Sequence, residues 1–166
     1  MSAEQVAHLF GFLPKEVVTL FIAMIPILEL RGAIPWALAN PPFGGGLSWS
    51  SAYLFAVIGN FLPVIPILLF LEPVSNTLRR YAIFDRFFEW LFRRTRRKGK
   101  MIERYEMLGL MLFVGIPLPV TGAWTGAVAA FIFGIRFWNS VIAIIGGICL
   151  SGIIVTLASL GVLSIF

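Results

Sequence analysis

Two residues of opposite charge, Glu29 and Arg31, lie within the apolar segment 17–39. An ionisable residue at membrane depth is costly and usually marks a pathway for a substrate, an ion or a proton. The Arg31 guanidinium can bind a phosphate or carboxylate group, while Glu29 can bind a cation or carry the protons that drive transport. The structural alternative is an ion pair that only holds this segment closed.

Helix-breaking residues surround the charged pair, namely Pro26, Gly32 and Pro35. Residues two positions apart do not face each other on a helix, but in unwound backbone they can. We therefore predict two half-length helices that meet at an unwound tip, the second restarting after Gly32. Its free N–H groups would then form an anion site together with Arg31.

A second apolar segment, 107–135, is also broken by proline and glycine, but its break carries no charge. Its candidate binding residues offer hydroxyl, indole and freed backbone groups: Pro117, Pro119, Thr121, Gly122, Trp124 and Thr125. Gly122 and Gly126 also have the G-x-x-x-G spacing, for which helix packing is the alternative. Non-helical backbone at membrane depth is tolerated only beside protein or a wet cavity, so we expect both breaks to line a site.

Two longer segments, 47–71 and 140–166, carry no charge. At 1.5 Å per residue the first would reach about 37 Å, which is enough to cross a bilayer. Pro63 and Pro66 predict a kink in the first span. Close helix contacts are expected in the second span at three glycines: Gly146, Gly147 and Gly152.

The remaining polar residues of the apolar segments are second-tier candidates. Asn60 lies alone in the first span, where a hydrogen bond between helices is the simplest expectation, and Arg136 is more typical of an interfacial anchor than of a ligand. The chain has one histidine and one cysteine, His8 and Cys149. No spacing predicts a metal site, a catalytic triad or a cofactor motif, so we expect neither an enzyme nor a cofactor.

Composition places the chain in a membrane. It is 59% hydrophobic with a mean hydropathy of +0.94, more than a soluble domain of 166 residues can bury. Ten of its 13 Lys and Arg residues lie in the segment 79–104, which is typical of a cytoplasmic loop rather than of a nucleic-acid site. Five apolar residues of this loop have the spacing of an amphipathic helix on the membrane surface: Phe84, Phe87, Phe88, Leu91 and Phe92.

We therefore predict an all-α polytopic membrane protein with a single membrane domain, 1–166. Its parts would be a hairpin and span (1–71), a basic amphipathic connector (72–106) and a second hairpin and span (107–166). If both hairpins are re-entrant, the two halves are inverted repeats with the basic loop in the cytoplasm and both termini outside. The alternative makes both broken segments full spans, with four crossings and both termini inside. It places Glu29 and Arg31 in mid-helix, at a few kcal/mol per charge, so we favour the re-entrant topology.

The sequences at both breaks resemble those of a known family. The blocks are Pro26-Ile-Leu-Glu29-Leu-Arg31-Gly-Ala-Ile-Pro35 and Gly115-Ile-Pro117-Leu-Pro119-Val-Thr-Gly-Ala-Trp124-Thr-Gly126. With these blocks, the chain resembles the small multidrug export protein family over nearly its whole length. That family distantly resembles the DedA (VTT-domain) superfamily. The first resemblance implies two facing re-entrant hairpins and membrane transport. The second implies proton-coupled movement of lipids, including polyprenyl-phosphate carriers. The acidic position of that superfamily maps to Glu29, but its second-hairpin arginine has no counterpart, because Val114 and Gly115 stand there.

Together these features predict a secondary transporter or lipid translocase in the plasma membrane of a prokaryote. The substrate would bind between the tips, with Arg31 contacting an anionic group and Glu29 coupling protons. Expected partners are membrane lipids, including anionic or polyprenyl-phosphate lipids, and a second copy of the chain, because 166 residues offer few helices to enclose a cavity. The alternative is a non-transporting membrane organiser that binds lipids or partners through the basic helix.

Overall fold

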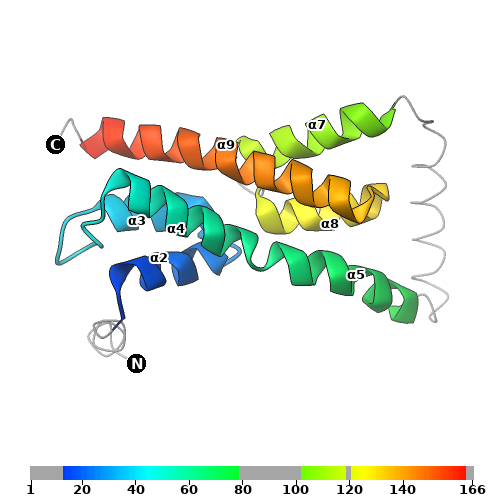
Figure 1. Ribbon diagram of the computed structural model, residues 1–166, viewed down its shortest axis with the longest axis horizontal. Helices are drawn as coiled ribbons and strands as arrows, with labels where there is room; N and C mark the ends of the chain where they lie inside the picture. Colours follow the sequence, from blue (N-terminus) through cyan, green and yellow to red (C-terminus); the bar gives the residue numbers. More distant parts are fainter. Residues whose placement is uncertain (1–12, 79–101, 119–120, 164–166) are drawn as a thin grey trace. The chain divides into compact units, whose positions relative to one another are not determined.

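The structure is a computed structural model, which describes residues 13–78, 102–118 and 121–163. Throughout these residues the regular elements are α-helices, which confirms the all-helical prediction (Figure 1). The helices are α2 (Lys15–Met24), α3 (Glu29–Leu38), α4 (Trp49–Phe61), α5 (Val64–Leu78), α7 (Ile102–Gly115), α8 (Ala123–Phe133) and α9 (Phe137–Leu163). The predicted surface helix and its cationic run lie outside the described residues.

Among the described residues, two stretches are long and apolar enough to cross a membrane, Trp49–Leu71 and Phe137–Gly161, in agreement with the two predicted spans. The first is divided into α4 and α5 by a short turn at residues 62–63. Pro63 and Pro66 explain this break, because neither has an N–H to continue the helical hydrogen bonds. Helix α5 then runs past the predicted end of the span to Leu78.

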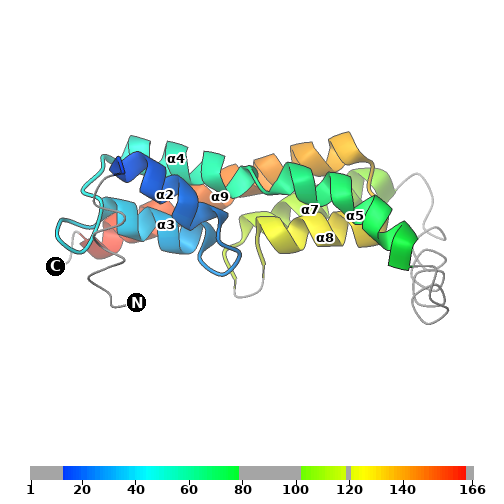
Figure 2. The ribbon, with the colours of Figure 1, turned by 90° about the horizontal axis from the view of Figure 1, so that it is seen from below.

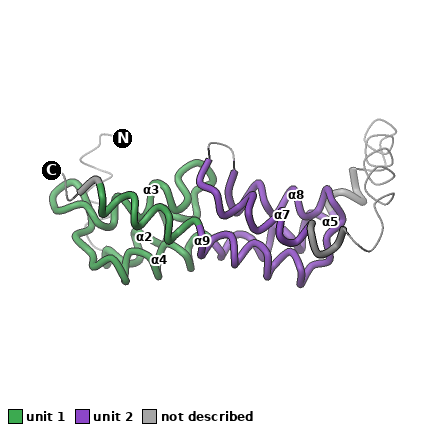
Figure 3. Tube along the Cα trace, turned by 90° about the horizontal axis from the view of Figure 1, so that it is seen from above, with its two compact units in different colours: residues 1–60, 151–166 green, residues 61–150 purple. Residues whose placement is uncertain are grey.

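The chain forms two compact units (Figure 3), residues 1–60 with 151–166 and residues 61–150. The first unit contains the α2–α3 hairpin, α4 and the second half of α9. The second unit contains the α7–α8 hairpin, α5 and the first half of α9. Helix α2 packs against α3, and α8 packs against both α5 and α7. Figure 2 shows the two hairpins from another side. Each unit therefore combines one hairpin with parts of both long segments.

Small residues allow the helices of the first unit to approach closely. A Cβ at Gly59 on α4 would overlap the Leu20 carbonyl oxygen on α2 and lie 2.9 Å from the Leu20 carbonyl carbon. A Cβ at Gly152 on α9 would lie 2.7 Å from the Tyr53 ring. These positions bring main chain against main chain, or main chain against an aromatic ring, which confirms the close contact predicted at Gly152.

The second unit uses glycine in the same way. A Cβ at Gly147 on α9 would lie 2.6 Å from the Val114 Cβ and 2.7 Å from the Met111 carbonyl oxygen, both on α7. A Cβ at Gly126 on α8 would overlap the Val114 side chain. Gly126 thus has the packing role that was the alternative for the G-x-x-x-G spacing. Val114 of α7 is consequently enclosed by α8 and α9.

The C-terminal end of α3 is capped by the glycine-rich loop that follows it. The N–H of Gly45 donates to the Trp36 carbonyl at 2.9 Å, and the N–H of Gly46 donates to the Ala39 carbonyl at 2.8 Å. A Cβ at Gly44 would overlap the Ala39 carbonyl oxygen, which explains why this loop needs glycine. Main-chain hydrogen bonds therefore fix the helix that carries Glu29.

Candidate functional site

The turn between α2 and α3 occupies residues 25–28, immediately before Glu29. The N–H groups of Leu28 and Glu29 both donate to the Ile25 carbonyl, at 3.1 and 2.9 Å. The N–H of Gly32 donates to the Leu28 carbonyl at 2.8 Å, so the first turn of α3 closes across Gly32. A break is therefore present at Pro26, as predicted, but it ends before Glu29 and Arg31, which lie in the first turn of α3.

The structure corrects two details of the prediction. Helix α3 restarts at Glu29 and not after Gly32, and Pro35 lies inside the helix without ending it. The N–H groups of Glu29 and Gly32 are also used by the preceding turn. The predicted row of free N–H groups after Gly32 was therefore wrong, and an anion site here would depend chiefly on the Arg31 side chain.

Glu29 has an unusual backbone conformation. Its φ angle is +45°, the only positive φ of a non-glycine residue in the part of the chain that the structure describes. An L-residue in this left-handed region costs about 1–2 kcal/mol, so the surrounding packing must hold it there. Strained residues of this kind cluster at binding and switching sites, which makes Glu29 the first candidate.

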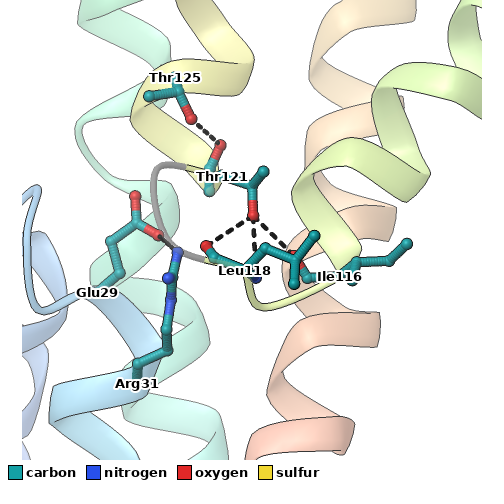
Figure 4. A network of polar contacts seen from close by, with 7 residues as sticks. Glu29, Arg31, Ile116, Leu118, Thr121 and Thr125 are labelled. Carbon is teal, nitrogen blue, oxygen red and sulfur yellow. Dashed lines mark hydrogen bonds and ion pairs between the residues drawn. The ribbon is translucent and has the colours of Figure 1, made fainter.

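This backbone conformation accompanies a close approach of the two charges (Figure 4). Arg31 Nη2 lies 3.8 Å from Glu29 Oε2. Charge-assisted hydrogen bonds are usually about 2.7–2.9 Å long, so this is a loose ion pair. The Glu29 side chain is 7% exposed, whereas that of Arg31 is 32% exposed. The arginine is therefore accessible to a ligand, and the carboxylate lies buried beside it.

The two prolines of this region shape the backbone more than they line a site. Pro26 lies in the turn and Pro35 on α3, and both are exposed. Gly32 is half-buried, and a Cβ there would lie 2.8 Å from the Leu28 Cβ. None of these three residues offers a polar side-chain ligand.

One hydroxyl links the described residues of the second break, 116–118 and 121–122 (Figure 4). Thr121 Oγ1 lies 2.8 Å from the Ile116 carbonyl oxygen and 2.9 Å from that of Leu118, and it accepts a hydrogen bond from the Leu118 N–H at 3.1 Å. Thr125 Oγ1 donates to the Gly122 carbonyl at 3.3 Å. Both hydroxyls are thus engaged with nearby main chain, where they stabilise the connector.

The predicted site residues divide between the two units. The first unit holds Asn60 and five residues of the first break: Pro26, Glu29, Arg31, Gly32 and Pro35. The second unit holds Pro117, Thr121, Gly122, Trp124, Thr125 and Arg136, while Pro119 lies outside the described residues. Arg136 is exposed just before α9, which suits an anchor. Glu29 and Arg31 are brought together as an ion pair within the first unit.

Asn60 does not form the expected hydrogen bond between helices. It is 2% exposed on α4, and its Oδ1 has no hydrogen-bond partner among the described residues. The hydroxyl of Thr156 on α9 is also buried without a partner there. Sequence reasoning missed Thr156, because a threonine in an apolar helix usually bonds the carbonyl four residues earlier and gives no signal of an unmet need.

The two long apolar stretches and the mean hydropathy indicate a membrane protein. Residues 29–154 match the profile of the family described as "Putative small multi-drug export protein". The match covers well over half of the 166 residues, so the chain belongs to this family. It begins at Glu29, immediately after the first break, and includes the second break. Searches of curated proteins and of solved structures gave no significant match.

Proposed function

We propose that the protein is a proton-coupled secondary transporter that moves an amphipathic small molecule or a lipid phosphate across the membrane. One observation carries this proposal: a buried carboxylate with strained backbone is loosely paired with a half-exposed arginine. A purely structural ion pair would gain from shorter, hydrogen-bonded geometry. The family description, which refers to export, supports the same class of function.

The pair suggests how binding and proton transfer are linked. Arg31 contacts the anionic group of the substrate, because its guanidinium is the more exposed partner. Leaving the buried Glu29 carboxylate without its cation is costly, so substrate binding at Arg31 favours a proton on Glu29. After the substrate leaves Arg31, Glu29 releases its proton and the ion pair forms again. Membrane lipids are the expected surroundings and a candidate source of the substrate.

We also propose that the two halves are inverted repeats with re-entrant hairpins. Helices α2 and α3 have 10 residues each and α8 has 11. At 1.5 Å per residue they reach about 15–17 Å, against roughly 30 Å for the hydrocarbon core. These lengths support hairpins that enter and leave on one side, with the basic loop 79–104 in the cytoplasm. Reporter fusions at the termini test this topology, and finding both termini inside would overturn it.

The functional test uses purified protein in proteoliposomes with an imposed pH gradient. The probes are a fluorescent amphipathic dye and a labelled polyprenyl phosphate. We expect Glu29→Gln to abolish gradient-driven transport, whereas Glu16→Gln, which makes the same change in the first turn of α2, retains it. Arg31→Gln should lower the apparent affinity for the anionic probe, with Arg136→Gln as its control. Full gradient-driven transport by folded Glu29→Gln protein would refute the mechanism.

The membrane-organiser alternative depends on the basic segment 79–104, most of which lies outside the described residues. It predicts the opposite result: activity survives the Glu29 and Arg31 substitutions. It is lost when Phe87 and Phe88 are replaced by polar residues and the basic run Arg93-Arg94-Thr95-Arg96-Arg97-Lys98 is neutralised. Measuring the hairpin variants and the basic-segment variants in one assay therefore separates the transporter from the membrane organiser.

A further inference from the structure

Gly32 lies four residues after Leu28, and the two residues are closer than an ordinary helix allows. On a regular helix, Cβ atoms four positions apart are about 5–6 Å from each other. A Cβ placed at Gly32 would lie only 2.8 Å from the Leu28 Cβ and 3.1 Å from its Cδ2. The Leu28 side chain therefore occupies the space that a side chain at position 32 would need.

The backbone between these two residues accounts for the contact. The Gly32 N–H donates to the Leu28 carbonyl at 2.8 Å, and Leu28 itself has right-handed angles, with φ −84° and ψ −52°. Glu29, which follows Leu28, is the residue of this turn with a positive φ, at +45°. Its left-handed backbone turns the Leu28 side chain toward Gly32. The strained conformation of Glu29 is therefore compatible with glycine at position 32 and not with a larger residue.

Rotation of the leucine side chain cannot relieve this contact, because the backbone fixes the position of a Cβ atom. A side chain at position 32 would instead drive Glu29 to the right-handed conformation that L-residues prefer. Residues two positions apart do not face each other on a regular helix, so Glu29 would then turn away from Arg31. An ordinary helical glycine would give the opposite result, because alanine is the better helix former.

We propose that Gly32 is a positioning residue for the Glu29–Arg31 pair: its missing side chain leaves room for Leu28 and so keeps the Glu29 backbone left-handed. Gly32 acts through Glu29 and contributes no ligand group of its own. The consequence for transport rests on the proposed function, whereas the effect on Glu29 can be measured on the isolated protein.

The test observes the Glu29 backbone by NMR of the full-length chain in detergent micelles. Glu29–Leu30 is the only Glu–Leu step in the sequence, so cell-free synthesis with ¹³C-labelled glutamate and ¹⁵N-labelled leucine marks this bond alone. The Cα and Cβ chemical shifts of Glu29 report its φ and ψ angles. We expect left-handed shifts in the wild type and right-handed helical shifts in Gly32→Ala. Gly109→Ala makes the same change in α7, where a Cβ meets nothing within 4 Å, and should leave the Glu29 shifts unchanged.

Two double variants make the result specific. Leu28→Gly combined with Gly32→Ala removes the leucine Cβ, so the left-handed shifts of Glu29 should return. Leu28→Ala combined with Gly32→Ala keeps a Cβ at position 28, so the shifts should stay right-handed. If Gly32→Ala does not fold, the same two variants decide, because only the one with Leu28→Gly should recover folded protein.

Left-handed Glu29 shifts in folded Gly32→Ala protein, or no difference between the two double variants, would overturn the proposal. Gradient-driven transport in proteoliposomes then separates it from the proposed function. Loss of transport in Gly32→Ala, with recovery in the variant that also carries Leu28→Gly, supports both. Full transport by Gly32→Ala protein whose Glu29 shifts have become right-handed would support the positioning role and contradict the proposed function.

Discussion

Replacing Gly59 by alanine should push α2 and α4 apart. The added Cβ would overlap the Leu20 carbonyl oxygen and lie 2.9 Å from both the carbonyl carbon and the Cα of Leu20. All three are main-chain atoms within α2, so no side-chain rotation can relieve the clash. Optimal carbon–carbon separations begin near roughly 3.5 Å, so the two helices must separate by roughly 0.6 Å.

The cost follows from this displacement. Overpacking of a well-packed contact usually costs about 1–3 kcal/mol, and a gap of 0.5–1 Å forfeits roughly a quarter to a half of the dispersion energy of the atoms concerned. Alanine gains about 0.5–1 kcal/mol over glycine as a helix former. We therefore expect Gly59→Ala to lower the free energy of unfolding by about 1–2 kcal/mol.

Gly109 provides the matched control, because it lies within α7 and a Cβ there would meet nothing within 4 Å. Gly109→Ala should raise the free energy of unfolding by about 0.5–1 kcal/mol. Both variants are compared by reversible denaturation in mixed micelles, followed by circular dichroism. Stabilisation by Gly59→Ala as large as that by Gly109→Ala would show that α2 and α4 do not approach at Gly59.

Two further predictions concern the hairpin turns. Glu29→Gly should be more stable than Glu29→Ala by about 1 kcal/mol in the same titration, because both lose the carboxylate but only glycine adopts φ +45° without strain; equal stability would contradict the left-handed backbone. Thr121→Val should lower the free energy of unfolding by about 1 kcal/mol, because it removes the hydroxyl that joins both ends of the second connector. Thr121→Ser keeps the hydroxyl, so it should retain most of this stability. An unchanged Thr121→Val titration would mean that this hydroxyl is dispensable.

Much of the fold follows from properties that act locally. The length of the two uncharged segments predicts the two apolar stretches. The prolines predict the interruption at residues 62–63, since a missing N–H removes a helical hydrogen bond in any context. The contacts of Gly147 and Gly152 could be anticipated because close helix packing requires small residues. The proximity of Glu29 and Arg31 was predicted from unwound backbone, whereas in the structure both lie in the first turn of α3 and their approach accompanies the left-handed backbone of Glu29.

The details of the site depend on the tertiary structure. Gly32 was interpreted as a breaker, but glycine in a helix costs only about 1 kcal/mol, which packing of α3 can outweigh. The left-handed conformation of Glu29 has no sequence signal, because glycine and asparagine are the usual residues there. Whether the buried amide of Asn60 is paired depends on which groups the neighbouring helices bring beside it, and an isolated polar residue in an apolar span does not reveal this.

The capping loop after α3 has a practical consequence for determining topology. Its hydrogen bonds use main-chain atoms of the glycines and of α3, so they make no demand on the side chain of Phe43, which is 88% exposed. A cysteine at position 43, in a chain whose own Cys149 is replaced by alanine, should be tolerated and open to modification. Membrane-impermeant thiol reagents would then report which side of the bilayer receives the end of α3.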